Sequence, residues 1–431
     1  MKLPKFITEN VLLKMTSLNA GVVGIRLFIA LFIQRIISSL LGPSGVALIG
    51  QLQSMTQLIT SITSFGIFNG IVKYVAEYKE DKEQLRKLFS TTFVFVASAS
   101  VITSLIFLIF STRISLYLFD SSRFDYIIKL MAVAIPFISL TRIFDGVVNG
   151  LSKYKLYAKV ELIAYLLSSA LTILFLFQFR LDGVLIALAI NPIIKLGILL
   201  YLFLGTLKEY VQFKKLSFKL YMSKELLAFT VMSFFSTVLL SFVEIDIRRM
   251  ITDKITQDDA GIWTGMTNIS KNYMVFSTSI FSLYVLPKFA SIYTRNDFFK
   301  ELINIYKTLL PLFGVGMLLV YLFRDYVIML IYPQFYEMAP LFKWQLLGDF
   351  LRLASIVLSY QFVAKRMVKS FIVTELLSVG LFYGFAIYLT DIFGVEGVVL
   401  AHLLRSIIYI SVVFLLVRLY FKRLEKKSDF K

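Results

Sequence analysis

Continuous apolar segments of about twenty residues recur along the whole chain, and they constrain the fold more than any other feature. The segment Phe93–Phe110, for example, contains no charged residue. Of the 431 residues, 58% are hydrophobic and only 17% are charged, whereas soluble domains are about 25% charged. A transmembrane barrel would instead show short segments of alternating polarity. We therefore predict an all-α integral membrane protein.

Hydropathy predicts twelve transmembrane helices in two bundles of six. The predicted spans lie near residues 15–40, 46–70, 90–112, 126–150, 156–179, 183–205, 226–248, 260–285, 304–323, 338–363, 369–390 and 396–418. The longest basic connection, Thr206–Lys224, separates the first six spans from the last six. We therefore predict an N-terminal six-helix bundle over 1–206, a cytoplasmic basic linker over 207–224 and a C-terminal six-helix bundle over 225–431.

Lysine and arginine are distributed unevenly between the two alternating sets of loops. The set that includes both termini carries 29 of them and the other set carries 7. Because cytoplasmic loops are enriched in these residues, both termini are predicted to face the cytoplasm. The net charge of +18 has the same origin. Since these cations are scattered over loops, they indicate contact with anionic lipid headgroups and no nucleic-acid partner.

The two halves share sparse internal similarity. The segment Val72–Tyr78 resembles Pro287–Tyr293, and each follows the second span of its half. The shift along the chain that relates these two segments is nearly equal to the one that superposes three pairs of like-charged residues, namely Lys129 on Lys343, Lys155 on Lys369 and Glu161 on Glu375. Chance similarity in a chain of biased composition is the alternative explanation. Repeats of this kind are typical of transporters with a site between two halves, so we predict a parallel pseudo-two-fold repeat around a central cavity.

The chain contains no cysteine and a single histidine, His402. Thiolate nucleophiles and cysteine-based metal sites are therefore excluded, and we predict no catalytic residue, no metal site and no cofactor. His402 lies one helical turn before Arg405, and we interpret it as a packing histidine beside a cation. The composition thus predicts that the protein is not an enzyme.

Charged residues inside the spans are the candidate functional residues, because each costs at least about 2.5–3.5 kcal/mol at the bilayer centre unless it faces protein or water. The cations are Arg26, Arg35, Lys129, Arg142, Lys195, Lys271, Lys343, Arg352 and Arg405. The acidic residues are fewer, namely Asp145, Glu161, Glu244, Asp246, Asp349 and Glu375. A cavity with this basic surplus favours an anionic ligand, above all phosphate, which the arginine guanidinium matches in geometry.

Five cations are the candidate ligands of a diphosphate group: Arg26, Lys271, Arg142, Arg352 and Arg35. Arg26 lies nearest the middle of its span and is our first choice, with Lys271 second. Arg35 lies nine positions after Arg26 and therefore on the opposite face of a straight helix. The two are not expected to share a cavity unless the helix bends, and snorkelling to the interface is the alternative role for Arg35.

Five further residues are candidates for gating or ion coupling: Asp145, Asp349, Glu244, Asp246 and Arg248. Their spacing predicts ion pairs within single helices, namely Arg142–Asp145, Asp349–Arg352 and Glu244–Arg248. Such pairs either stabilise the fold or act as gates whose carboxylates bind a coupling proton, and both interpretations stay open. At the outer end of the seventh span, Glu244, Asp246 and Arg248 form either a periplasmic latch or a solvated group.

Three strings of the sequence resemble one known family. They are Gly66-Ile-Phe-Asn-Gly70 followed by Lys73-Tyr-Val-Ala-Glu-Tyr78, Gly261-Ile-Trp-Thr-Gly265 leading to Tyr284-Val-Leu-Pro287, and Trp344-Gln-Leu-Leu-Gly-Asp349 with Ala364-Lys365. Together they resemble the Wzx polysaccharide translocases of the multidrug/oligosaccharidyl-lipid/polysaccharide (MOP) exporter superfamily, especially the O-antigen and enterobacterial common antigen (lipid III) branch. The resemblance covers essentially the whole chain and its MATE-like fold. By motif, the family-like positions are Lys73, Trp263, Trp344, Gln345 and Asp349.

The resemblance implies a flippase that moves undecaprenyl-diphosphate-linked oligosaccharide from the cytoplasmic to the periplasmic leaflet of a bacterial inner membrane, as in lipopolysaccharide biosynthesis. It implies alternating access driven by a gradient of H+ or Na+, with a polysaccharide polymerase and a chain-length regulator as partners. The sequence agrees in having no Walker-type phosphate loop. It leaves the glycan, the coupling ion and the oligomeric state open.

Two alternatives remain. A cation-coupled multidrug antiporter of the same superfamily has the same architecture, but its cavity should carry an acidic surplus. A membrane polysaccharide polymerase or acyltransferase handles the same lipid carrier, but it needs polar catalytic loops, whereas the extracytoplasmic loops predicted here are short.

Overall fold

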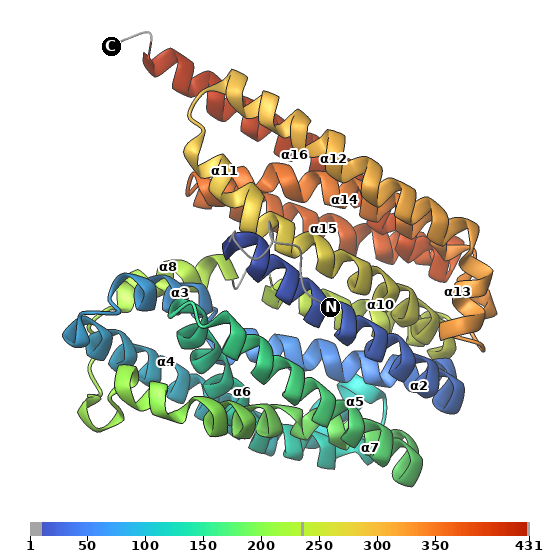
Figure 1. Cartoon of the computed structure of the whole chain (residues 1–431). Coiled ribbons are helices and arrows are strands. Elements are labelled where there is room, and N and C mark those ends of the chain that lie inside the picture. The colour runs from blue at the N-terminus through green and yellow to red at the C-terminus, as the bar shows by residue number, and fades with distance from the viewer. Residues whose placement is uncertain (1–10, 234–236, 429–431) are drawn as a thin grey trace. The chain divides into compact units, whose positions relative to one another are not determined.

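The computed structural model describes residues 11–233 and 237–428, and every regular element in these two ranges is a helix (Figure 1). The chain forms two compact units. Unit 1 comprises Met1–Ile33 and Leu48–Ile245, and unit 2 comprises Gln34–Ala47 and Asp246–Lys431. Residues 1–10, 234–236 and 429–431 of the predicted bundles lie outside the described residues. The predicted division at the linker 207–224 stays a prediction.

The helices follow one another with short connections. Unit 1 contains most of α2 (Val11–Thr63), then α3 (Phe68–Glu77), α4 (Lys82–Ile109), α5 (Ser111–Phe119), η1 (Ser122–Phe124), α6 (Asp125–Gly150), α7 (Tyr154–Val211), η2 (Phe213–Lys215) and α8 (Ser223–Ser233). The unit boundary falls within α9 (Leu239–Lys254). Unit 2 continues with α10 (Gln257–Ile280), the π-helical turn η4 (Phe281–Val285), α11 (Leu286–Ser291), α12 (Arg295–Leu322), α13 (Arg324–Ile331), η5 (Tyr336–Met338), α14 (Leu341–Ala364), α15 (Val368–Phe393) and α16 (Val395–Ser428).

Two very long helices each contain a break that divides them into two spans. α2 is interrupted at Gly42, with φ 65° and ψ −171°, a conformation that glycine adopts without a side-chain clash. α7 is interrupted at Arg180, with φ 54° and ψ −130°. At 1.5 Å per residue, an unbroken α7 would be far longer than the roughly 30 Å hydrocarbon core of a bilayer. Each helix therefore supplies two of the predicted spans, although α2 ends at Thr63 and not near residue 70 as predicted.

Eight helices among the described residues are long and apolar enough to cross a membrane. Counting α2 and α7 twice and adding α9 and α10 accounts for the twelve predicted spans. Charged residues such as Arg248 and Lys271 lower the hydropathy of α9 and α10. The chain is a multi-pass helical membrane protein.

The second half of the chain repeats the helix breaks of the first half. α4 and α12 have 28 residues each. Residues with positive φ follow α6 and α14, namely Ser152 at 56° and Arg366 at 52°. A second pair of residues with positive φ corresponds in the same way. Arg180, at 54°, interrupts α7, and Gly394, at 58°, separates α15 from α16. In each pair, the two residues are as far apart along the chain as Lys129 is from Lys343. The internal repeat is thus confirmed, while its axis and the central cavity stay predictions.

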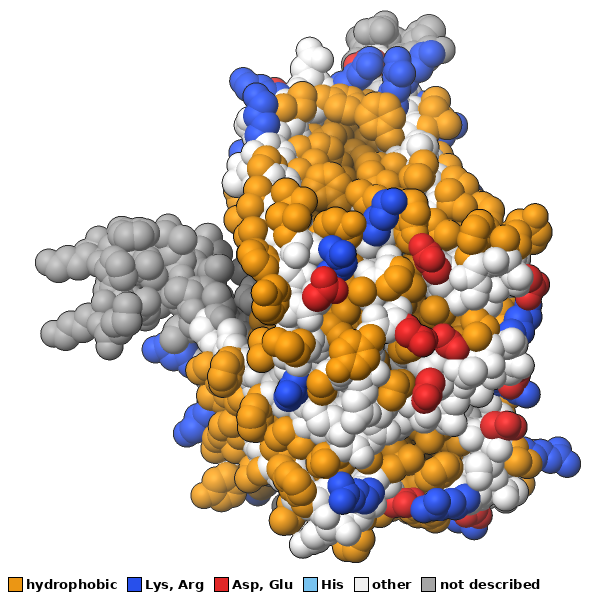
Figure 2. All heavy atoms as spheres, turned by 90° about the vertical axis from the view of Figure 1, so that its right-hand side faces the viewer, with side chains coloured by type: hydrophobic (Ala, Val, Ile, Leu, Met, Phe, Trp, Pro, Cys, Tyr) orange, Lys and Arg blue, Asp and Glu red, His pale blue; other side chains and the backbone are white. Residues whose placement is uncertain are grey.

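Each unit has an aromatic and aliphatic core of its own. Phe89, Val147 and Phe203 pack together in unit 1, and Phe298 and Phe362 lie in the core of unit 2. Large hydrophobic side chains are exposed along several helices, for example Ile102 and Ile109 of α4 and Leu318 of α12. Figure 2 shows others on the face that carries α13, with acidic, basic and uncharged polar side chains among them. An apolar exterior of this kind suits a lipid environment, since lipid replaces water as the solvent.

Candidate functional site

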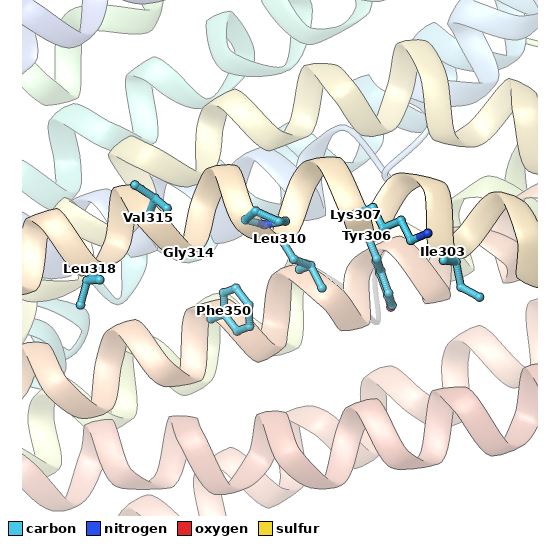
Figure 3. A pocket seen from close by; sticks show the side chains of 9 residues that line it. Ile303, Tyr306, Lys307, Leu310, Gly314, Val315, Leu318 and Phe350 are labelled. Atoms are coloured by element: carbon cyan, nitrogen blue, oxygen red, sulfur yellow. The ribbon is translucent and has the colours of Figure 1, made fainter.

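An open groove runs along α12 and is completed by Phe350 of α14 (Figure 3). Its volume is about 680 Å³ and its lining is apolar except for Lys307 and the hydroxyl of Tyr306. Such a lining offers few partners to a phosphate group or a sugar, because buried polar groups need hydrogen bonds. The candidate polar site therefore lies among the charged side chains of the predicted spans.

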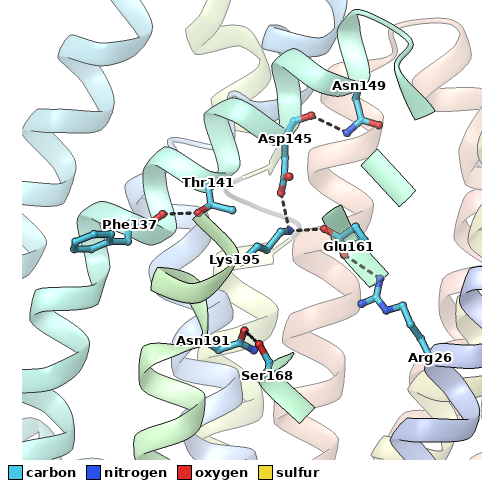
Figure 4. A network of polar contacts seen from close by, with 9 residues as sticks. All are labelled: Arg26, Phe137, Thr141, Asp145, Asn149, Glu161, Ser168, Asn191 and Lys195. Atoms are coloured by element: carbon cyan, nitrogen blue, oxygen red, sulfur yellow. Dashed lines mark hydrogen bonds and ion pairs between the residues drawn. The ribbon is translucent and has the colours of Figure 1, made fainter. Parts of the chain in front are cut away.

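Four charged side chains form a continuous chain of ion pairs inside unit 1 (Figure 4). The Arg26 guanidinium lies 2.9 Å from Glu161 Oε2. The other oxygen of Glu161 lies 2.5 Å from Lys195 Nζ, which also lies 2.8 Å from Asp145 Oδ2. Arg26 comes from α2 and Asp145 from α6, while Glu161 and Lys195 come from the two parts of α7. We call these four residues the unit 1 network.

Exposure changes along the unit 1 network. The side chain of Arg26 is 38% exposed, that of Lys195 25%, that of Glu161 14% and that of Asp145 4%. Arg26 also lies over the ring of Tyr165, 5.0 Å from its centroid. Asp145 Oδ1 is buried without a hydrogen-bond partner among the described residues. Arg26 is therefore the end of the network that a ligand reaches most easily.

Close helix packing brings α6 into position beside α3. A Cβ atom on Gly146 would lie 2.9 Å from Ile71 Cγ2, and one on Gly150 would lie 2.8 Å from Val75 Cβ. These glycines are four positions apart and hence lie on one face of α6, as in the small-residue packing motifs of membrane helices. Asp145 immediately precedes the first of them and faces α7 through its bond with Lys195.

The unit 1 network has a counterpart in unit 2, related by the shift that superposes Lys129 on Lys343. Under this shift, Asp145, Glu161 and Lys195 correspond to Ser359, Glu375 and Tyr409. The Tyr409 hydroxyl donates a hydrogen bond of 3.0 Å to Glu375 Oε1. The contact between Glu161 and Lys195 thus has a counterpart between Glu375 and Tyr409. In unit 2, however, tyrosine replaces the lysine and serine replaces the aspartate. Of these two sets of three positions, only the one in unit 1 includes a cation.

A second polar cluster surrounds Asp349 in unit 2. Its Oδ2 accepts hydrogen bonds from Ser270 at 2.5 Å, from Gln345 at 3.2 Å and from the Tyr273 hydroxyl. Its Oδ1 lies 2.9 Å from Nε2 of His402. The sequence interpretation of His402 as a packing residue is therefore incomplete, because the imidazole is part of a hydrogen-bonded cluster.

Two of the ion pairs predicted within single helices are wrong. Asp145 pairs with Lys195 of α7 instead of Arg142, and the Arg142 guanidinium lies over the ring of Phe68, 3.8 Å from its centroid. Asp349 accepts a hydrogen bond from His402 of α16, and no ion pair joins it to Arg352 among the described residues.

A spacing of three positions only gives two side chains the opportunity to meet. Partners on neighbouring helices bind more strongly where packing excludes solvent, because screening there is weak. In the described structure, the packing of neighbouring helices therefore determines the partners of Asp145 and Asp349, and the spacing within one helix does not.

The charged residues of α9 lie on both sides of the unit boundary. In unit 1, Glu244 accepts a hydrogen bond of 3.3 Å from Ser54, and in unit 2, Asp246 accepts one of 2.5 Å from Tyr383. Arg248 is buried and donates a hydrogen bond of 2.8 Å to Thr264. Simple solvation therefore does not describe Arg248, and the latch at this place stays a prediction.

The two arginines of α2 belong to different units. Arg26 contacts Glu161 within unit 1, while Arg35 donates to the carbonyl oxygen of Met329 within unit 2. This agrees with their predicted positions on opposite faces. Lys271, the second choice from the sequence, lies on α10 with an exposed side chain.

The family-like positions have specific contacts. Trp344 Nε1 donates a hydrogen bond of 2.5 Å to Glu396, and the ring of Trp263 lies 5.3 Å from the Arg248 guanidinium. Lys73 lies over the ring of Tyr74. Lys365, in the connection after α14, donates to the carbonyl of Ala290 at 2.9 Å, and partial burial lowers the pKa of its ammonium group. No group of three or more metal-ligating side chains occurs among the described residues.

Sequence reasoning noted Glu161 and Lys195 but did not choose them as site residues. The repeat gave one signal, because Glu161 superposes on Glu375 under the same shift as the lysine pairs. No sequence signal identified Lys195, since its partners Asp145 and Glu161 lie many helical turns away from it along the chain.

The sequence of this chain matches that of a known protein family. The model of the family described as "Polysaccharide biosynthesis protein" matches residues 12–293. A protein of Escherichia coli named lipid III flippase is 28% identical over 408 residues, which cover 91% of this chain and 96% of the relative. A protein of Shigella flexneri with the same name matches equally well.

Solved structures share the fold. An inward-facing MATE transporter of the MOP superfamily has a TM-score of 0.79 at 15% identity, covering 94% of this chain and 96% of the transporter. The lipid II flippase MurJ has a TM-score of 0.72 at 13% identity, covering 93% of this chain and 87% of MurJ. The resemblance drawn from the three motifs is thus confirmed. The chain belongs to the polysaccharide biosynthesis protein family and has the fold of the MOP superfamily.

Proposed function

We propose that this protein is a flippase that carries undecaprenyl-diphosphate-linked oligosaccharide across a bacterial inner membrane, from the cytoplasmic to the periplasmic leaflet. Its family, the two relatives named lipid III flippase and the fold shared with a lipid II flippase support this assignment. The excess of 29 over 7 cations in the loops on the side of the termini supports cytoplasmic termini.

The observation that carries the proposal is the accessible end of the unit 1 network. The Arg26 guanidinium pairs with the carboxylate of Glu161, which has a second cation in Lys195. A diphosphate that replaces Glu161 at Arg26 gains a forked, charge-assisted contact. Glu161 meanwhile keeps Lys195 as its partner, so that no charge of the network is left unpaired. Exchange of partners therefore allows binding and release without a large desolvation cost.

The chemistry of the cargo explains why a protein site is needed. Each polar group that enters hydrocarbon without a hydrogen bond costs on the order of several kcal/mol. A flippase supplies replacement partners for the diphosphate and the sugars, while the prenyl tail stays in lipid. We propose Lys271 of α10 as a further cation for the head group, since its side chain is exposed. Transport by alternating access, driven by a gradient of H+ or Na+, completes the proposal, and a polysaccharide polymerase and a chain-length regulator are its proposed partners.

The two rival functions fit the described residues less well. An antiporter of cationic drugs needs an acidic surplus, but the unit 1 network contains two acidic and two basic side chains. A polymerase or acyltransferase needs polar catalytic loops, but the connections between the described helices are short.

Reconstitution into liposomes tests the proposal directly. Purified protein is incorporated with a labelled undecaprenyl-diphosphate oligosaccharide, and the labelled lipid reaching the opposite leaflet is measured. We expect transfer by the wild type and loss of transfer in Arg26→Ala and Lys271→Ala. Arg113→Ala is the matched control, because Arg113 is an exposed cation on α5 whose guanidinium lies over the ring of Phe110, apart from the unit 1 network.

Absence of transfer by the wild type would overturn the assignment. Undiminished transfer by both Arg26→Ala and Lys271→Ala would overturn the proposed site. In cells, deletion of the gene should leave the lipid-linked oligosaccharide on the cytoplasmic side. Single repeat units that reach the surface but are not polymerised would favour the polymerase instead.

A further inference from the structure

The Asp349 cluster of unit 2 is arranged around the single histidine of the chain, and the proposed diphosphate site does not use it. Asp349, His402 and Arg405 are all buried. The imidazole lies between the other two, with Nε2 2.9 Å from Asp349 Oδ1 and Nδ1 2.8 Å from Arg405 Nη2.

A glycine makes room for the imidazole. A Cβ atom on Gly348 would lie 2.6 Å from His402 Cδ2 and 3.1 Å from its Nε2. Gly348 belongs to the string Trp344-Gln-Leu-Leu-Gly-Asp349, which also supplies Gln345 and Asp349 to the cluster. This string therefore builds a seat for the ring as well as its carboxylate partner.

The hydrogen bonds determine where the imidazole carries its proton. A guanidinium can only donate, so Nδ1 must accept from Arg405 with a free lone pair. Nε2 then carries the hydrogen and donates it to Asp349. His402 is thus a neutral imidazole with one nitrogen open to a proton, provided that Arg405 moves away.

The carboxylate of Asp349 already has four hydrogen-bond donors. It accepts from Ser270, Gln345 and Tyr273 at one oxygen and from His402 at the other. These donors stabilise the negatively charged form of the carboxyl group, and an added proton there would remove that charge. At His402 Nδ1, an added proton replaces a single hydrogen bond, the one from Arg405, and leaves the carboxylate charged.

The charges around the ring come from every helix packed against it. Asp349 and Arg352 lie on α14, Arg405 on α16 and Tyr273 on α10, while α15 contributes Phe382 and Glu375. Arg405 lies over the ring of Phe382, 4.4 Å from its centroid.

We infer that His402 is the binding site of the coupling proton. A proton added at Nδ1 breaks the bond from Arg405 and turns the imidazole into a cation that stays paired with Asp349 through Nε2–H. Repulsion between the imidazolium and the guanidinium then moves Arg405 away from the ring. One proton is bound and no bond is made or broken except these hydrogen bonds.

The same geometry disfavours a sodium ion at this place. Sodium binds to oxygen lone pairs, but four donors already bind the two oxygens of Asp349. The neighbouring guanidinium groups of Arg352 and Arg405 also repel a fixed metal cation. A histidine whose protonation changes its partners is a known type of pH-dependent switch.

The inference rests on the proposed transport function, and its test measures how a proton gradient biases transport. Wild-type protein and His402→Gln are reconstituted with labelled undecaprenyl-diphosphate oligosaccharide. Glutamine keeps a donating and an accepting group but does not titrate near neutral pH. If one proton moves per substrate, a gradient of one pH unit changes the transmembrane distribution of substrate about tenfold. We expect this change for the wild type and no change for His402→Gln, with unaltered lipid-diphosphate binding and gradient-free exchange.

A second variant and a spectroscopic readout guard against a variant that fails to fold. Gly348→Ala pushes the ring from its seat and should weaken the response to the gradient. Nitrogen NMR of histidine-labelled wild type observes one imidazole only, and it should show a hydrogen on Nε2 and none on Nδ1 at alkaline pH. Hydrogen on Nδ1 under those conditions would overturn the inference.

The transport outcomes separate the two proposals. If wild type transfers the lipid and His402→Gln responds to the proton gradient as the wild type does, the histidine inference fails and the flippase stands. A response of the wild type to sodium alone has the same meaning. If the wild type transfers no lipid under any gradient, both proposals fail.

Discussion

Replacement of Lys195 by methionine should destabilise unit 1 strongly. Lys195 is the partner shared by Asp145 and Glu161, and both carboxylates are largely buried. Removing one partner of a buried ion pair costs about 3–5 kcal/mol, because the remaining charge is left uncompensated. Glu161 keeps Arg26, whereas Asp145 has no other ion-pair partner among the described residues. We therefore assign most of the loss to Asp145.

The expected size distinguishes this ion-pair network from ordinary membrane hydrogen bonds. Interhelical hydrogen bonds in membrane proteins contribute only about 0.6 kcal/mol on average. For domains of about 150–250 residues, 1 kcal/mol shifts the melting temperature by about 2–4 °C. We therefore expect Lys195→Met to lower the melting temperature by about 6–20 °C, against about 1–3 °C for loss of a single average hydrogen bond.

Thermal unfolding of the purified variants in detergent measures the effect. Lys129→Met is the matched control, because the pair of Lys129 with Asp125 is exposed and lies within one helix. Such surface pairs contribute about 0–1 kcal/mol. The double variant Asp145→Asn with Lys195→Met should recover most of the loss, since it removes both charges. Equal melting temperatures for Lys195→Met and Lys129→Met would refute the reasoning.

Two further substitutions test the packing of unit 2. In Gly261→Ala the new Cβ would lie 1.9 Å from the carbonyl oxygen of Pro43, so we expect a loss of about 1–3 kcal/mol in thermal unfolding. Gly24→Ala is the control, because nothing lies within 4 Å of a Cβ at that position. An unchanged melting temperature of Gly261→Ala would contradict the close approach. Trp344→Phe removes the hydrogen bond from the indole to Glu396. This should cost about 1.5–3 kcal/mol in thermal unfolding, because the acceptor is a charged group. A melting temperature equal to that of the wild type would show that the bond contributes nothing.

The order of the helices could be predicted from the sequence because lipid imposes a simple length rule. Apolar segments must span the bilayer, and the predicted span 126–150 coincides almost fully with α6. The errors occur where backbone conformation decides. Positive φ at Phe65 and Gly66 ends α2 earlier than hydropathy indicates, and the turn made by these two residues is not visible in a hydropathy profile.

The candidate site was predictable only in part. The cost of burying charge singled out Arg26 and Asp145, and both belong to the unit 1 network, but the partners between them, Glu161 and Lys195, depend on how α6, α7 and α2 pack. The sequence shows only that His402 lies one helical turn before Arg405, which favours a packing role. The significance of His402 lies in contacts with two other helical positions, Asp349 and Arg405, and these follow from tertiary structure.

The affinity of the purified protein for undecaprenyl diphosphate is the measurement that tests the central claim most directly. The account predicts that Arg26→Ala weakens binding about ten- to hundredfold, since a hydrogen bond to a charged group contributes about 1.5–3 kcal/mol. Arg113→Ala should bind as the wild type does, and the wild type should prefer the diphosphate over undecaprenyl monophosphate. Equal dissociation constants for wild type and Arg26→Ala would contradict the account.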